Sequence, residues 1–217
     1  MNSSVSGNKG EGVGILIGFS KTGSHISNVQ IINSTAINAN NNAAFIVGRN
    51  DIALTIEDVY VTGSTATSTN INTDAGVGGF VGYANNAASV IDIKRSVIED
   101  SALNGSGTGA LVGFYKLGSL AATDVFMDIE FTYADVNGQH GIIGRRTSET
   151  TSEPVIIDVW GYFVGQQVHL DAIDLASEFK LADLTGLNQA WRTTNLVSFT
   201  TNDLWTFDEV SNFYELA

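Results

Sequence analysis

Three aspartates have the most obvious capacity for chemistry in this sequence of 217 residues. Asp58, Asp124 and Asp158 are of the residue type that glycoside hydrolases use as an acid–base pair. Each stands directly before a valine in the same short motif, and Asn28 takes that place in another copy. A catalytic pair usually arises once, whereas these residues recur. We therefore expect them to mark a repeated turn or a polar ladder, and we predict no catalytic residue and no enzymatic activity.

The remaining residue types do not suggest a metal or nucleophile site. His25, His140 and His169 stand in different contexts, and no His-x-x-x-His pattern joins them. The absence of cysteine removes disulfides, thiolate ligands and thiol catalysis. The sequence contains no Gly-x-Ser-x-Gly elbow and no phosphate-binding loop. We therefore predict that the protein binds no metal and no cofactor.

The charge balance narrows the choice of partners. Asp and Glu number 23 against 10 Lys and Arg, which gives a formal net charge of −13. An acidic surface repels phosphate backbones and anionic lipids, so we predict no nucleic-acid binding. No apolar run approaches the roughly 20 residues needed to span a bilayer, so we also predict no membrane insertion. Positions 1–12 lack the apolar stretch of a signal peptide, and the chain is expected to be a mature protein or a piece of a longer one.

A short motif recurs along the chain and organises it. The motif consists of a small residue, any residue, two apolar residues and a glycine, as in Ala44-Phe45-Ile46-Val47-Gly48. The spacings between its closing glycines are 30, 34, 31 and 31 residues, which is typical of a repeat architecture. The closing glycines are Gly18, Gly48, Gly82, Gly113 and Gly144.

A second motif follows each copy and predicts strands. Apolar residues alternate in it, as at Val29 and Ile31 or Val59 and Val61, and Ser34 or its counterpart ends it. The segments are short, rich in β-branched residues and interrupted by Gly and Asn, which disfavours helices. We predict an all-β fold, a parallel right-handed β-solenoid of about five coils over residues 1–168, because coils stacked about 4.8 Å apart share one core.

The C-terminal region breaks the repeat. Leu170, Ile173, Ala176 and Phe179 are spaced as one face of a short helix. We therefore predict a capping segment over residues 169–217 that contains a short helix and the last strands. Trp191 and Trp205 are expected to pack into the last coils.

Both motifs together resemble the GLUG repeat of large bacterial surface and secreted proteins. The C-terminal stretches Leu204-Trp205-Thr206-Phe207 and Phe213-Tyr214-Glu215-Leu216 are similar to the tryptophan strand and the Tyr-Pro-x-Leu-like finish of such arrays. Glu215 stands where those arrays have proline. The resemblance covers roughly the whole chain and implies a solenoid scaffold at a cell surface. It implies little about function, because the repeat is architectural.

Residues at the same position of the motif form a column along the solenoid. The two neighbouring columns that begin at Leu16 and Ile17 are apolar in every copy. Because Arg49 and Arg145 stand two positions beyond the second column, we expect that column to face outward and the Leu16 column to face the core. In the second motif, Tyr60 and its counterparts point outward. The expected assembly or ligand surface comprises Ile17, Phe19, Val47, Arg49, Tyr60, Val81, Tyr83, Val112, Phe114, Phe126, Ile143, Arg145 and Trp160.

Two other arrangements would explain the same columns. The C-terminal segment can fold back over one sheet, or a corner at the glycine can turn both columns inward. The N-terminus has no evident cap, so the first coil is expected to continue into other repeats or to stack on another subunit. Contacts of the second kind lead to a filament.

These observations favour a non-enzymatic, extracellular or cell-surface structural or adhesive solenoid, whose partner is a further copy of itself. The first alternative is a carbohydrate-binding or polysaccharide-processing β-helix. It would use the outward aromatic residues Tyr60, Tyr83, Phe114, Phe126 and Trp160. The second alternative is a viral fibre or spike domain.

Overall fold

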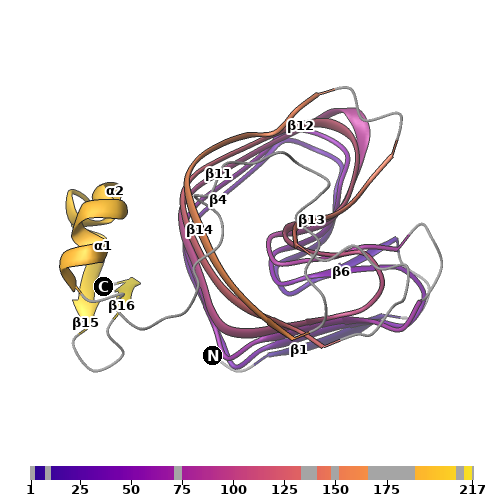
Figure 1. Cartoon of the computed structure of the whole chain (residues 1–217). Coiled ribbons are helices and arrows are strands. Elements are labelled where there is room, and N and C mark those ends of the chain that lie inside the picture. Colours follow the sequence, from indigo (N-terminus) through magenta and orange to yellow (C-terminus); the bar gives the residue numbers. More distant parts are fainter. Residues whose placement is uncertain are drawn as a thin grey trace.

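The computed structural model of the chain describes residues 3–7, 11–70, 75–132, 141–147, 152–165, 189–208 and 213–216. Within them, the predicted parallel β-solenoid is confirmed, with each coil lying on the one before (Figure 1). A C-terminal segment with short helices stands beside the solenoid, also as predicted.

The strands of successive coils follow one order. The chain begins with β1 (Ser4–Gly7) and enters a first coil of β2 (Gly12–Gly14), β3 (Ile17–Ser20), β4 (Ser24–Ile32) and β5 (Thr35–Asn38). The second coil holds β6 (Asn42–Ala44), β7 (Val47–Asn50), β8 (Leu54–Thr62) and β9 (Thr65–Ser68). The next coils hold β10 (Val77–Gly78) with β11 (Val81–Asn104), then β12 (Thr108–Phe131), then β13 (Gly141–Arg146) with β14 (Val155–Gly165).

Neighbouring coils pair in parallel, and equivalent residues of the repeat lie above one another. One wall of the solenoid consists of the long strands β4, β8, β11, β12 and β14. A second wall contains β1, β5 and β9, which pair in that order. The column of the second apolar residue runs through Ile17, Val47, Val81, Val112 and Ile143. The hydrophobic core is therefore continuous along the solenoid, as the stacking of repeats requires.

The first motif folds into the interior of the solenoid. The motif forms an inserted loop, which we call the tongue; in the first two coils it consists of two short strands, which are β6 and β7 in the second coil (Figure 1). The chain bends between these strands, at residues 45–46 in the second coil. A Cβ built on Gly79, at the tip of the next tongue, would lie 2.8 Å from Cδ1 of Ile98 in the wall. The tip of the tongue thus faces the long wall.

The recurring glycine is explained by its close approach to the opposite leg of the tongue in the preceding coil. A Cβ on Gly48 of the second coil would lie 2.3 Å from the backbone nitrogen of Val13 in the first coil. A Cβ on Gly113 of the fourth coil would lie 2.4 Å from the backbone nitrogen of Val77 in the third coil. Both distances are far too short for a real contact, so only glycine fits between the legs.

The predicted outward orientation of the second apolar column is wrong. Val47, Val81, Val112 and Ile143 are at most 3% exposed and belong to the main core. Both columns face inward, as in the second alternative raised by the sequence, but the chain bends at residues 45–46 in the second coil and not at the glycine. Most of the Leu16 column is in the core, as predicted, but Leu16 itself is 41% exposed in the first coil.

The aspartates of the second motif lie at a sharp corner of each coil, as the repeated-turn interpretation predicts. The corner residue has a positive φ in every copy, between 39° at Arg95 and 55° at Asp124. Asn and Asp tolerate this left-handed conformation better than other residues that have a side chain. We call these residues the corner column: Asn28, Asp58, Arg95, Asp124 and Asp158.

The serines that end the second motif stabilise a further corner. The buried hydroxyl of Ser64 donates to the carbonyl of Thr62 at 3.0 Å and accepts from the backbone N–H of Ser34 at 3.1 Å. Ser101 repeats the pattern one coil later, towards Glu99 and Ser64. Each hydroxyl thus satisfies backbone groups of two coils, so these serines are structural residues.

The C-terminal segment forms a separate small unit, which we call the cap (residues 189–208 and 213–216). It holds α1 (Gln189–Asn195), α2 (Val197–Thr200) and an antiparallel pair of strands, β15 (Trp205–Asp208) and β16 (Phe213–Leu216). The helix predicted around Leu170 to Phe179, and the boundary predicted at position 168, lie outside the described residues.

The tight tongue generates a first prediction. Gly113→Ala should lower the free energy of unfolding by about 3 kcal/mol, because the new methyl group meets the backbone of Val77 and the legs must separate. Gly23→Ala is the matched control, since a Cβ there meets no atom within 4 Å, and it should change stability by about 0.5 kcal/mol or less. Urea unfolding of both variants measures the difference; equal effects would contradict the close approach of the legs.

Candidate functional site

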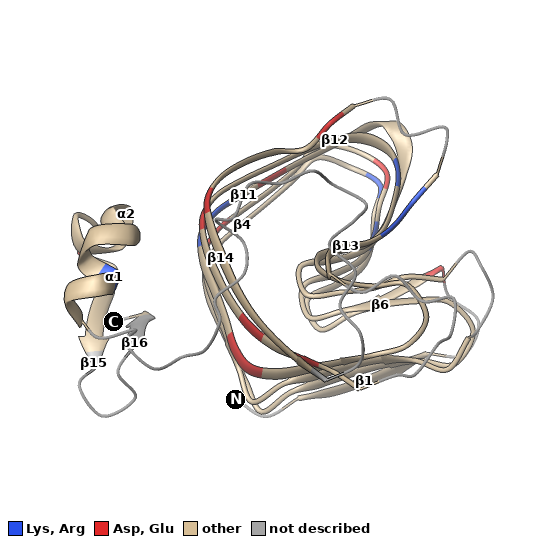
Figure 2. Ribbon diagram, in the orientation of Figure 1, with Lys and Arg blue, Asp and Glu red and all other residues tan. Residues whose placement is uncertain are grey.

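The residues predicted to form a surface separate into three groups in the structure. The second apolar column lies in the core, as described above. The column of Phe19 and its counterparts forms a stacked ladder, and the column of Tyr60 and its counterparts lies under the cap. Charged residues follow the outer walls and the outer ends of the tongue, as Figure 2 shows for the described residues.

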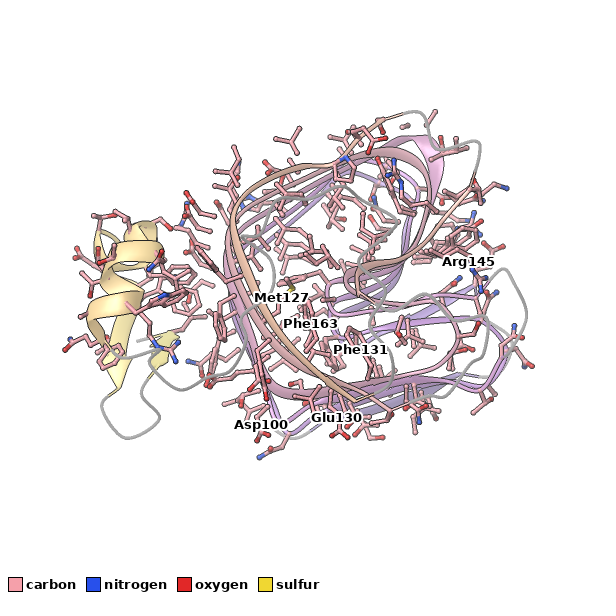
Figure 3. All side chains as sticks on the ribbon, in the orientation of Figure 1. Asp100, Met127, Glu130, Phe131, Arg145 and Phe163 are labelled. Carbon is pink, nitrogen blue, oxygen red and sulfur yellow. The ribbon has the colours of Figure 1, made fainter. Side chains whose placement is uncertain are left out.

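The ladder alternates aromatic rings and guanidinium groups. The Arg49 guanidinium lies 4.6 Å from the ring centroid of Phe19 and 5.5 Å from that of Tyr83. The ring of Tyr83 stacks on Phe114 at 5.0 Å. The guanidinium of Arg145, which Figure 3 labels, follows at 5.5 Å from the Phe114 ring. These contacts run from the first coil to the fifth and stabilise the stacking of coils through cation–π attraction.

Ion pairs and burial remove this ladder from the candidates for an open surface. Arg49 donates to both carboxylate oxygens of Asp51 at 2.9 Å and also pairs with Glu11. Tyr83 and Phe114 are 9% and 2% exposed. The expectation that this column offers an exposed assembly or ligand surface is therefore wrong for Tyr83 and Phe114, whereas Phe19 is partly exposed.

The column of Tyr60 follows the outer flank of the solenoid; we call Gln30, Tyr60, Val97, Phe126 and Trp160 the flank stripe. Tyr60, Val97 and Phe126 are at most 4% exposed because the cap covers them. The cap residues in this second cluster are Leu196, Phe199, Trp205 and Leu216, with Trp191 and Phe207 partly buried. The sequence-based alternative of a C-terminal segment folded over one sheet is thus correct for this flank.

The aromatic contacts extend over several coils. Trp191 of α1 meets Trp160 of the fifth coil edge to face, with centroids 5.1 Å apart. Trp205 meets Phe199 within the cap at 4.7 Å, but it reaches the second coil rather than the last coils that the sequence suggested. Tyr60 and Phe126 are therefore not the exposed aromatic residues that a sugar-binding surface requires.

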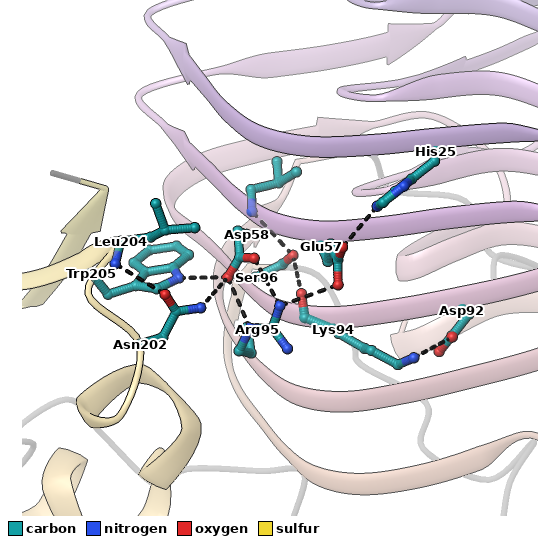
Figure 4. Close-up of polar contacts among 11 residues, drawn as sticks. His25, Glu57, Asp58, Asp92, Lys94, Arg95, Ser96, Asn202, Leu204 and Trp205 are labelled. Carbon is teal, nitrogen blue, oxygen red and sulfur yellow. Dashed lines mark hydrogen bonds and ion pairs between the residues drawn. The ribbon is translucent and has the colours of Figure 1, made fainter.

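A buried carboxylate anchors the cap to the solenoid (Figure 4). Asp58, which is 4% exposed, accepts a hydrogen bond from Nε1 of Trp205 at 2.9 Å and one from Nδ2 of Asn202 at 3.3 Å. Arg95 donates to both oxygens of the same carboxylate, at 2.9 and 2.8 Å. The Arg95 guanidinium also reaches Glu57 at 3.1 Å.

The corner column explains why these groups meet. Asp58 occupies the left-handed corner of the second coil, and Arg95 occupies the same corner of the third coil with a φ of 39°. Arginine is unusual in this conformation, but the stacking of coils places its guanidinium beside the Asp58 carboxylate. Sequence reasoning found the column of corners and missed the ion pair. The signal for it was Arg95, the one member of the corner column that is neither Asn nor Asp.

Burial and hydrogen bonding shift the pKa values of the corner carboxylates in opposite directions. Burial alone would raise the pKa of Asp58, but the hydrogen bonds from Arg95 and Trp205 and the charge of Arg95 outweigh it, so the pKa lies below its ordinary value. Burial raises the pKa of Asp124, and the nearby charge of Asp158 adds to this shift. Asp58 is therefore a fixed anion and the centre of a binding contact.

An acidic hollow of about 270 Å³ lies at the other corner of the wall. Asp100, Asp128 and Glu130 line it, and Figure 3 shows Asp100 and Glu130 on the outer side while Met127 and Phe163 point inward. Burial raises the pKa of Asp128, and the charge of Asp100 adds to this shift. Among the described residues, no group of three or more His, Asp or Glu side chains is arranged to hold a metal ion.

Comparisons with known proteins add no relative. No family model, no curated protein and no solved structure matches the chain. The resemblance to GLUG repeats stays a prediction based on the motifs. In the part of the chain that the structure describes, no helix has the length and apolar character needed to cross a membrane.

The anchor generates a second prediction. Asp58→Asn should lower the free energy of unfolding by about 2 kcal/mol near neutral pH, because two charge-assisted hydrogen bonds from Arg95 are weakened. Since the folded-state pKa of Asp58 is depressed, its contribution is present above the unfolded-state pKa and is lost as the pH falls through the folded-state value. The difference in the free energy of unfolding between the unmodified chain and Asp58→Asn should therefore become smaller in acid.

Thermal unfolding over a range of pH measures this difference. The raised pKa of Asp124 favours the folded state in acid, but it does so in both proteins and so cancels in the comparison. Asp158→Asn, at the exposed corner of the fifth coil, is the control and should change stability by about 0.5 kcal/mol or less. A difference for Asp58→Asn that is independent of pH would contradict the ion pair.

Proposed function

We propose that this protein is a non-enzymatic structural or adhesive β-solenoid of an extracellular or cell-surface array, and that it associates with further copies of itself through the open end of its first coil. The observation that carries the proposal is the exposure of core columns at that end. Leu16 is 41% exposed, whereas Ile46, Phe80 and Leu111 in the same column are 0% exposed. Among the described residues, each later copy has a coil on its N-terminal side, whereas no described strand lies beside Leu16 on that side.

The backbone at this end is also open. β2, β3 and β4 each pair with the second coil, and no described strand pairs with their other edges. Unpaired edges of parallel strands invite pairing with another chain. The strands β13 and β14 of the fifth coil likewise pair along one described edge only, but the core side chains Ile142, Ile143 and Val159 there are at most 3% exposed. The first coil therefore supports assembly better than the apolar outer faces that the sequence suggested.

The use of the carboxylates supports a scaffold rather than a catalyst. Asp58 accepts hydrogen bonds from Arg95, Trp205 and Asn202, so its lone pairs are occupied by the protein itself. Asp124 and Asp158 repeat the same backbone corner. Residues that recur at one structural position and are used by the fold are poor candidates for acid–base chemistry.

Sedimentation velocity over a range of concentrations tests the proposal. We expect the unmodified chain to form oligomers as its concentration rises and Leu16→Glu to remain monomeric, because a charge on the exposed column cannot be buried unpaired. Ile157→Glu is the matched control: Ile157 is 50% exposed on the flank of the fifth coil, and its replacement should leave association unchanged. An unmodified chain that is monomeric at every concentration would overturn the proposal.

A further inference from the structure

The cap is attached to the solenoid by side chains. Its strands β15 and β16 pair with each other as a separate two-stranded sheet, and no described strand of the cap joins the solenoid sheet. Its polar contacts with the solenoid include those of Trp205 and Asn202 with Asp58, and a hydrogen bond from Nε2 of Gln30 to the carbonyl of Leu216 at 2.7 Å. The cap is therefore a docked unit and not an extension of the repeat.

The surface that receives the cap belongs entirely to the solenoid. Gln30, Tyr60, Val97, Phe126 and Trp160 follow one column of the wall, in register from β4 to β14. Their hydrophobic cluster is separate from the main core, which lies on the other face of the wall. Because the register and the core of the wall do not involve the cap, the flank stripe is preformed and persists when the cap leaves it.

We propose that the flank stripe and Asp58 form an interaction surface for the cap of a second copy of this chain, so that two copies exchange caps. The occupant is identified by the contacts already seen: the indole N–H of Trp205 meets the Asp58 carboxylate, and Leu196, Phe199 and Leu216 cover Tyr60 and Phe126. The same atoms are available on every copy. No other partner is needed to explain an aromatic stripe beside a buried, already paired anion.

The length of the chain permits the exchange. Gly165 at the end of β14 and Gln189 at the start of α1 are 24 positions apart, a distance of up to about 80 Å for an extended chain. The closed and exchanged forms contain identical contacts between cap and flank, so their balance depends on concentration and on the entropy of the connection. Exchange is favoured where solenoids are held close together, as in an array, but it does not require the association proposed for the first coil.

Complementation between two defective chains tests the exchange. The first chain carries Phe126→Asp, which spoils the receiving surface and leaves the cap intact. The second carries Trp205→Ala, which removes the cap's hydrogen bond to Asp58 and leaves the surface intact. Both also carry Leu16→Glu, so that failure of association through the first coil cannot affect the result. Mixing the two should give a one-to-one complex by native mass spectrometry, with a blue shift of tryptophan fluorescence, whereas each chain alone stays monomeric.

Two controls keep the outcome decisive. In the first control, the second chain carries Val197→Ala instead of Trp205→Ala. Val197 is a cap residue that is 54% exposed, so this cap should stay docked in its own chain and no complex should form. If Phe126→Asp fails to fold, Leu16→Glu chains with light and heavy isotopes, unfolded together and refolded at high concentration, should yield mixed dimers that the further change Trp205→Ala removes. Chains that sediment as independent monomers in the mixture, or mixed dimers that persist in Trp205→Ala, would overturn the proposal.

Discussion

The structure depends on one constraint, the backbone-to-backbone contact between a leg of one tongue and the opposite leg of the tongue in the preceding coil. Gly48 and Gly113 approach that leg so closely that no Cβ fits, and this contact recurs in successive coils. In the second coil the chain bends at residues 45–46, and Ile46 and Val47 are both buried. The tongue fills the interior, and its apolar residues, Phe45 and Phe80 among them, join those of the walls in one closely packed core.

The corners carry the second constraint, and the docking site follows from it. A left-handed residue at the same place in every coil aligns short polar side chains along one edge of the wall. In four coils these are Asn or Asp, and in the third coil Arg95 joins them. A guanidinium placed one coil away from Asp58 neutralises the carboxylate, which can then be buried under an indole at modest cost.

The sequence predicted the fold because its signals are local and repeated. Glycine spacing, the alternation at Val29 and Ile31, and the Asx residues before valine each indicate the same coil. The orientation of Val47 and Val81 could not be predicted, because alternation assigns opposite faces only along a straight strand, and the bend of the tongue breaks this rule. The contact of Trp205 with Asp58 joins positions 147 apart, and no repeat or spacing encodes it.

The edge of the first coil and the flank stripe offer different kinds of contact to another molecule, and this difference decides how assembly would proceed. The edge of the first coil offers backbone groups and Leu16, so a partner there must supply parallel or antiparallel strands. The flank stripe is already covered by a side-chain contact with a set geometry, so it selects a single occupant, the cap. The side chains of the two ends differ, since Leu16 is 41% exposed and its counterpart Ile142 is 3% exposed, although both ends offer unpaired strand edges among the described residues. A cap docked on another copy would add a second, independent contact between molecules.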